Sequence, residues 1–204
     1  MSGKLSSDLL QLYGQHWPEI GDRLFIPGHD VWFAQTAEER TYRLGKGYKL
    51  AGDRLVQNAF GHPADYEDLV YPIIFCYRHS IEVVLKAIIE EHGSVVGVTL
   101  READHDLPNL WKLFLHIAKA VGCHRGDEIA AVGACIKEMA AVDPGAISFR
   151  YARTKRGDLV SISRDGIDLQ NLQARIDGIY FFLECADQAF SDERDTRSLS
   201  YRAV

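Results

Sequence analysis

The chain has 204 residues, of which 47% are hydrophobic and 25% are charged. This balance is typical of a soluble globular protein, and it excludes a disordered, a collagen-like or a membrane-embedded chain. The net charge of −6 argues against a protein that coats nucleic acid with its whole surface, but it leaves room for a local basic patch. The length fits one domain.

The N-terminal residues, the longest apolar segment and the cysteines indicate in which compartment the protein lies and whether its thiols are paired. The N-terminal twelve residues contain no apolar stretch of the signal-peptide kind. The longest strongly apolar segment, Leu69–Tyr77, is far shorter than the ~20 residues that cross a bilayer. The four cysteines form no Cys-x-x-Cys pair, and both Cys76 and Cys185 fall in apolar helical patterns, which favours buried thiols over disulfides or zinc ligands. We expect a cytoplasmic protein without membrane contact, bound metal or cofactor.

The N-terminal third divides into an arm and a helix. Residues 1–36 show no sustained periodicity, which predicts a loosely structured arm. From 37 to 60, apolar residues recur three and four positions apart, which predicts one face of a helix. That face consists of Tyr48, Ala51, Leu55 and Ala59. Three glycines lower the intrinsic helix propensity of this segment, so tertiary packing must hold it.

The middle of the chain predicts three more helices. Residues 65–91 are apolar nearly all round, as expected for a central, buried helix, with a kink or a start near Pro72. Asp106 precedes Leu107-Pro108, which predicts a helix start with a capping carboxylate, and Gly122 marks its end. A fourth helix is expected over 126–141.

The pattern changes after the fourth helix. Residues 147–164 predict a short β-hairpin or an extended excursion. A last helix is expected from Asp168 to about Phe190, where apolar residues again alternate by three and four. The polar stretch 191–204 is expected to be a mobile tail. The predicted fold is therefore an all-α bundle of about five helices, forming a single domain over 37–190.

A row of charges interrupts the apolar central helix. Arg78, Glu82 and Lys86 are spaced i, i+4 and i+8, with His79 beside them. One interpretation is a partly buried ladder of ion pairs. The other is a groove in which Arg78 binds phosphate and His79 moves a proton. Because ion-pair networks mimic active sites, the spacing by itself favours the ladder.

A second candidate is the basic segment, which we define as Phe149–Arg156. Its four cations lie within seven residues, without an acid among them, and they alternate with aromatic rings. They are Arg150, Arg153, Lys155 and Arg156, with Tyr151 among them. Cations that neutralise phosphates beside rings that stack on bases suit single-stranded RNA. The alternative is a solvated loop whose arginines pair with acids of the bundle.

Histidine and aspartate suggest a third possibility. His79 precedes His105-Asp106 by 26 residues, a spacing tolerable for a metal phosphohydrolase of the HD type, in which imidazole and carboxylate groups hold a divalent ion. The small apolar residues expected before His105-Asp106 are missing, so structural histidines remain the simpler interpretation. Nucleotide-binding, nucleophile-elbow and zinc-protease motifs are absent from the sequence.

Two stretches resemble a known family. The segment Tyr71–Lys86 is similar to the central "Arg-His-x-hydrophobic-Glu-x-x-Leu-Lys" helix of HEPN-like bacterial proteins, and His105-Asp106-Leu107 with Leu110 resembles the start of their next helix. Phe149-Arg150-Tyr151 before a turn, and a last helix that opens with Asp168-Leu169, are similar too. The resemblance covers roughly 38–190.

The resemblance implies a helical bundle that forms homodimers in prokaryotic toxin–antitoxin and phage-defence systems, with an antitoxin or another defence protein as partner. Several members are metal-independent endoribonucleases, in which an arginine and a histidine separated by four to six intervening residues share one helix face. This chain departs from that pattern, because the positions after Arg78 hold Val83, Val84 and Leu85, and Pro27-Gly28 separate Arg23 from His29.

These observations lead to one hypothesis with two alternatives. The first is an RNA-associated, possible endoribonuclease function, in which Arg78, His79 and Glu82 are catalytic, while Lys86 and the basic segment bind RNA. The alternatives are a non-catalytic module that binds RNA, a nucleotide or a partner protein, and the metal phosphohydrolase.

Overall fold

The computed structural model describes residues 20–25, 32–100, 105–122, 126–160, 162 and 166–202. The chain divides into two compact units, Met1–Phe33 and Ala34–Val204. Most of the predicted N-terminal arm lies outside the described residues. The description that follows therefore concerns the second unit.

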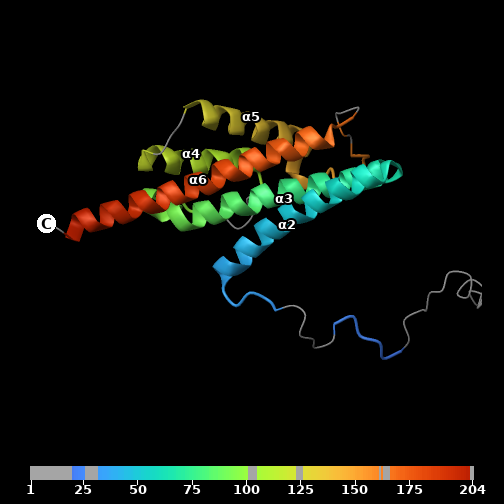
Figure 1. Ribbon diagram of the computed structural model, residues 1–204, viewed down its shortest axis with the longest axis horizontal. Coiled ribbons are helices and arrows are strands. Elements are labelled where there is room, and N and C mark those ends of the chain that lie inside the picture. The colour runs from blue at the N-terminus through green and yellow to red at the C-terminus, as the bar shows by residue number, and fades with distance from the viewer. Residues whose placement is uncertain are drawn as a thin grey trace, which may run out of the picture. The chain divides into compact units, whose positions relative to one another are not determined.

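Five α-helices make up the described part of this second unit, which confirms the predicted all-α bundle (Figure 1). Short 3₁₀ turns lie at Pro63–Asp65, Gly93–Val96 and Pro144–Ala146. The α-helices are α2 (Ala37–Gly61), α3 (Tyr66–His92), α4 (Leu107–Val121), α5 (Gly126–Val142) and α6 (Leu169–Arg202). Among the helices described, none is both long and apolar enough to cross a membrane.

Local chemistry sets several helix ends. The Thr36 hydroxyl accepts the Glu39 N–H at 3.1 Å and so satisfies one free donor at the start of α2. Gly122 ends α4 in the left-handed conformation, with φ of 79°, which glycine adopts without strain. Asp106 occupies the N-cap of α4, but its side chain makes no capping hydrogen bond. The predicted capping role is therefore wrong, because the Asp106 carbonyl alone accepts the first helical N–H groups.

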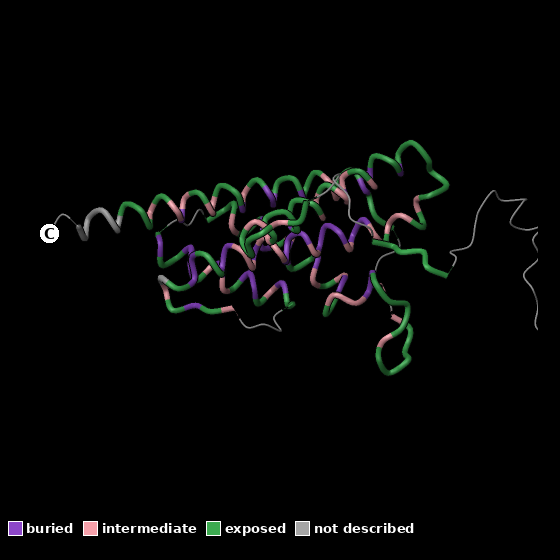
Figure 2. The backbone as a smooth tube through the Cα atoms, turned by 90° about the horizontal axis from the view of Figure 1, so that it is seen from below, coloured by how far each residue is buried: buried purple, intermediate pink, exposed green. Residues whose placement is uncertain are grey.

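Helix α3 is the centre of the bundle and contacts α2, α4 and α6 (Figure 1). Burial is concentrated on the helix faces that meet, while the outward faces are exposed (Figure 2). Ile73, Ile81 and Leu85 of α3 are fully buried beside Phe114 of α4 and Leu183 of α6. This packing agrees with the predicted central helix.

The glycines of α2 explain how it packs so closely against α3. A Cβ atom at Gly52 would stand 2.6 Å from the Tyr77 ring, so only glycine admits that ring. The Tyr77 hydroxyl donates to Asp53 at 2.9 Å, and the Tyr180 hydroxyl of α6 donates to the Gly45 carbonyl at 2.9 Å. The residues that weaken the helix intrinsically thus allow the contacts that hold it.

Two predicted boundaries differ in the structure. Helix α6 continues to Arg202 rather than stopping near Phe190, because no glycine or proline interrupts 191–202 and side chains bond one turn apart, as Gln188 does with Asp192 at 2.8 Å. The described part of 147–164 contains no strand. A single antiparallel bridge between Arg153 and Leu159 closes a loop there. The described residues therefore form the predicted extended excursion, with one bridge in place of a β-hairpin.

Candidate functional site

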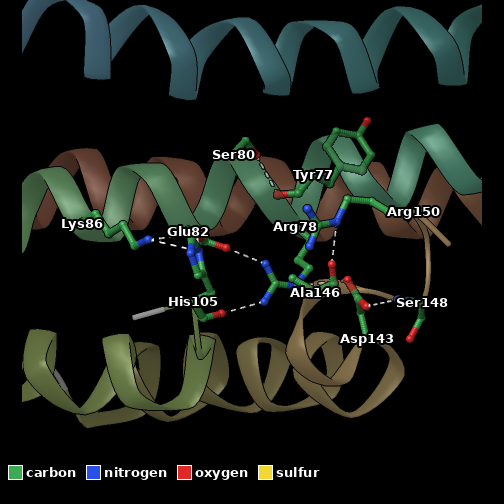
Figure 3. Close-up of polar contacts among 10 residues, drawn as sticks. All are labelled: Tyr77, Arg78, Ser80, Glu82, Lys86, His105, Asp143, Ala146, Ser148 and Arg150. Atoms are coloured by element: carbon green, nitrogen blue, oxygen red, sulfur yellow. Dashed lines mark hydrogen bonds and ion pairs between the residues drawn. The ribbon is translucent and has the colours of Figure 1, made fainter. Parts of the chain in front are cut away.

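Arg78 lies inside the bundle and is 3% exposed. Its Nη1 donates to Glu82 Oε2 at 2.6 Å, and its Nη2 donates to the His105 carbonyl at 2.8 Å. Its Nε stands 3.2 Å from Asp143 Oδ2, which makes an ion pair without hydrogen-bond geometry. Figure 3 shows the guanidinium reaching from α3 toward the segment before α4 and the turn after α5. Arg78 therefore ties three segments together.

Glu82 is the second member of this buried cluster and is 2% exposed. Its Oε1 lies 2.6 Å from His105 Nδ1 and accepts from Lys86 Nζ at 2.9 Å. Burial by itself raises the pKa of the Glu82 carboxyl, but the hydrogen bonds from His105, Lys86 and Arg78 outweigh burial and lower it to about 2. Glu82 is thus ionised at neutral pH, and its carboxylate bonds Arg78, Lys86 and His105.

Asp143 completes the cluster from the end of α5. It is 2% exposed, and its Oδ1 accepts the Ser148 N–H at 2.7 Å while Oδ2 faces Arg78. We call Arg78, Glu82, Lys86, His105 and Asp143 the ion-pair cluster (Figure 3). Its two carboxylates offset its two permanent cations, so the charges balance within the cluster, as buried charges must.

His79 faces another side of α3, because neighbouring residues on a helix point about 100° apart. Its ring stacks on Phe75 at 5.7 Å between centroids and meets the edge of Tyr48 of α2 at 4.5 Å. Burial of the ring lowers the pKa of His79 below its usual value, since desolvation disfavours the charged form. The structure therefore separates His79 from Arg78 and Glu82.

His79 belongs to an aromatic row on α3. Tyr71, Phe75 and His79 are spaced i, i+4 and i+8, which places them on one helix face. Tyr71 also lies 6.4 Å from Phe149, and the Arg150 guanidinium lies 5.9 Å from the centre of the Phe75 ring. The row is half-buried to exposed along its length. The basic segment therefore begins directly on the aromatic row.

The remaining cations of the basic segment are exposed. The same Arg150 guanidinium lies 5.4 Å from the ring centre of Tyr151, which is 58% exposed. Arg153 donates only to the Gly157 carbonyl within its own loop, at 2.8 Å. Among the residues the structure describes, no carboxylate pairs with any of the four cations of the segment. Pairing with acids of the bundle, the alternative interpretation, is therefore not seen there.

A pocket of about 630 Å³ opens beside this loop. It lies where α2 turns into α3 and where α6 begins (Figure 1). Rings supply much of its lining, from Phe60, Tyr66, Tyr71 and Phe149. Phe60 and Tyr71 are about half exposed. Aromatic faces and a concave surface thus meet at the start of the basic segment, where the charged residues of the pocket are Glu67 and Asp168.

Metal-ligating residues gather elsewhere. Within the described part of the chain, the group whose ligand atoms lie within 4.8 Å of one another is Glu91, His92 and Asp187, rather than His79, His105 and Asp106. His92 Nε2 bonds Asp187 Oδ1 at 2.8 Å, and Glu91 pairs with Arg194 at 3.3 Å. These groups already have protein partners, and the residues suggested for a phosphohydrolase are not brought together.

The structure thus splits the predicted site in two. Arg78, Glu82 and Lys86 belong to the ion-pair cluster, whereas His79 joins Arg150 and Tyr151 beside the aromatic row. Sequence reasoning missed Asp143, which no spacing rule connects to Arg78. It also missed the aromatic row, although the four-residue spacing of Tyr71, Phe75 and His79 was visible in the sequence.

Comparisons of this chain with protein-family models, with curated proteins and with solved structures find no match.

Proposed function

We propose that this protein binds single-stranded RNA, without cleaving it, through the basic segment and the aromatic row beside it. In this proposal it is a HEPN-like, RNA-associated homodimer of a bacterial defence or toxin–antitoxin system, and it acts in the cytoplasm. The observation that carries the proposal is the position of Arg150 over Phe75, the middle ring of the aromatic row, with three further exposed cations in the same segment.

The chemistry matches what a single strand offers. Unpaired bases stack on aromatic faces, which contribute about 1–3 kcal/mol per base, while lysine and arginine neutralise the phosphates between them. Tyr151 exposes its ring beside Arg150, and Tyr71 exposes its ring beside Phe149 at the start of the basic segment. Duplex RNA buries its bases within the stack, so the rings favour single strands.

Binding without turnover is supported by the position of Arg78. Its guanidinium is 3% exposed and already bonded to Glu82 and the His105 carbonyl. A substrate phosphate would have to displace these partners and leave Asp143 buried without its cation, which is costly. In this arrangement Arg78 stabilises the fold, whereas the basic segment makes the RNA contacts.

The direct test is fluorescence anisotropy with a labelled single-stranded RNA of about 20 nucleotides, longer than the ~4–16 nucleotides that a single-strand-binding fold covers. We expect salt-sensitive binding that is stronger than binding to the matching duplex. Replacing Arg153, Lys155 and Arg156 together by alanine should weaken it by at least about tenfold and flatten its salt dependence.

The matched control is Lys137→Ala, which removes an exposed cation from α5 and should leave the affinity unchanged. Equal RNA binding by the triple variant and by the wild type would contradict the proposal. The same reactions, resolved on a denaturing gel without added metal, test turnover. Cleavage that His79→Ala abolishes would establish the endoribonuclease function in place of simple binding.

A further inference from the structure

A large groove lies between α2, α3 and α6, within the second unit of the chain. Its volume is about 1140 Å³, and its α2 wall runs from Ala37 to Asp53, about 24 Å at 1.5 Å per residue. Large apolar side chains stand open to solvent on it, with Phe181 71%, Tyr42 64% and Leu50 45% exposed. Exposed apolar surface gathered in a groove is typical of a surface that binds a partner.

The charge of the groove identifies the kind of partner. Eight carboxylates and two lysines line it. Lys49 is already held by Asp53 at 2.8 Å and by Asp177 at 2.6 Å. Among the described residues, the side-chain carboxylates of Glu38, Glu90 and Glu184 on its walls have no ion pair or hydrogen bond. The apolar floor is therefore flanked by unneutralised negative charge.

We propose that this groove binds a basic amphipathic helix of a partner protein, with the apolar face of that helix on Phe181, Tyr42 and Leu50 and its cations toward Glu38, Glu90 and Glu184. Helices bind such grooves through apolar residues spaced three and four apart. A wall of about 24 Å accommodates roughly four turns. The surface is separate from the basic segment, so this inference does not depend on RNA binding.

Charge also decides against the other occupants. Nucleic acid would be repelled by eight carboxylates, and a second copy of this chain carries a net charge of −6 itself. Opposite charge across an interface steers association and selects partners, while like charges suppress them. A basic amphipathic helix can pack apolar residues on the floor of the groove and pair its cations with the carboxylates of the walls.

The test uses the full chain and two labelled peptides of about 20 residues, long enough to cover the wall. Both carry leucine three and four positions apart, and their polar positions hold lysine in one peptide and glutamate in the other. We expect the lysine peptide to bind, with an affinity that falls as salt rises, and the glutamate peptide not to bind. Equal binding of both peptides would overturn the proposal.

Two variants with matched controls locate the site. Phe181→Asp and the pair Glu90→Lys with Glu184→Lys should each weaken lysine-peptide binding by at least about tenfold. Leu44→Asp, on α2 outside the groove, and Glu128→Lys, on α5, should change it by less than about twofold, since neither lines the groove. Loss of binding in the controls as well as in the groove variants would overturn the assignment.

Light scattering distinguishes a partner helix from a second copy. If Phe181→Asp converts a dimer into a monomer, the groove is a self-association surface and the proposal is wrong. If the oligomeric state is unchanged while peptide binding is lost, the proposal holds. RNA affinity should be the same in Phe181→Asp as in the wild type, so failure of this inference is distinguishable from failure of the RNA-binding proposal.

Discussion

Arg78 and Arg150 show how one residue type serves opposite purposes in one molecule. Arg78 is buried and surrounded by Glu82, Asp143 and the His105 carbonyl. Arg150 is exposed, bonds only a backbone carbonyl and faces two aromatic rings. A buried guanidinium carries its charge into the fold and needs carboxylates to offset it, while an exposed one over rings keeps its charge available to a ligand. The Arg78 guanidinium is therefore enclosed by its own partners, whereas the cations of the basic segment are open to solvent.

The largest expected effect is on the ion-pair cluster. Arg78→Met should lower the free energy of unfolding by about 3–5 kcal/mol, because Asp143 would stay buried without a cation and Glu82 would keep only Lys86 and His105. Urea denaturation at neutral pH measures this loss. Lys86→Met is the matched control, since the Lys86 side chain is 18% exposed against 3% for Arg78 and Glu82 keeps Arg78 and His105, so this change should cost less than Arg78→Met. A loss below about 1 kcal/mol for Arg78→Met would show that the two carboxylates do not depend on it.

The pH dependence of the free energy of unfolding below about pH 5 is a second test of the same cluster. The pKa of Glu82 is about 2 in the folded protein, below the ordinary 4.5, so the unfolded chain binds the proton more readily. The stabilisation, on the order of 3 kcal/mol, is complete above about pH 5 and is lost as the pH falls toward 2. Glu82→Gln should therefore lose less stability than the wild type over that range in urea titrations. An equal loss of stability in Glu82→Gln and in the wild type would contradict the assignment of this pH dependence to Glu82.

The sequence could predict the helices because their apolar spacing and end residues are local. The periodic residues of 37–60, the apolar run of 65–91 and Gly122 at the end of α4 all correspond to observed elements. The extension of α6 was not predicted, because a polar sequence after Phe190 was interpreted as a tail, although nothing in it interrupts a helix.

The division of the candidate site could not be predicted from spacing. Helix geometry predicts that Arg78 and His79 point about 100° apart, but only the packing of α3 shows that one meets the segments beside α4 and α5 and the other meets α2. Asp143 lies 65 residues from Arg78 in the sequence, so no local pattern joins them. Composition identified the cations of the basic segment, but the rings of α3 beneath Arg150 required the fold.

An intermediate effect is expected at Tyr151. Tyr151→Ala should weaken single-stranded RNA binding by about 1–3 kcal/mol, because one stacking surface is lost, while Tyr151→Phe should retain most of the affinity. Both variants should keep the free energy of unfolding within about 0.5 kcal/mol, since the side chain is 58% exposed. Anisotropy and urea denaturation measure the two quantities. A stability loss without an affinity loss would assign Tyr151 to the fold, along with Arg78.

The smallest expected effect concerns His79, which follows Arg78 in the chain but belongs to the aromatic row beside the basic segment. Its pKa is lowered in the folded protein, chiefly by burial, so the unfolded chain takes up the proton first as the pH falls below about 6.5. The stability that depends on a neutral ring is complete above that pH and declines below it. His79→Phe keeps the stacking on Phe75 and the contact with Tyr48 but cannot titrate. Its stability should therefore vary less than that of the wild type between about pH 7 and pH 5. If the two proteins show the same slope in that range, His79 does not titrate as a buried member of the aromatic row.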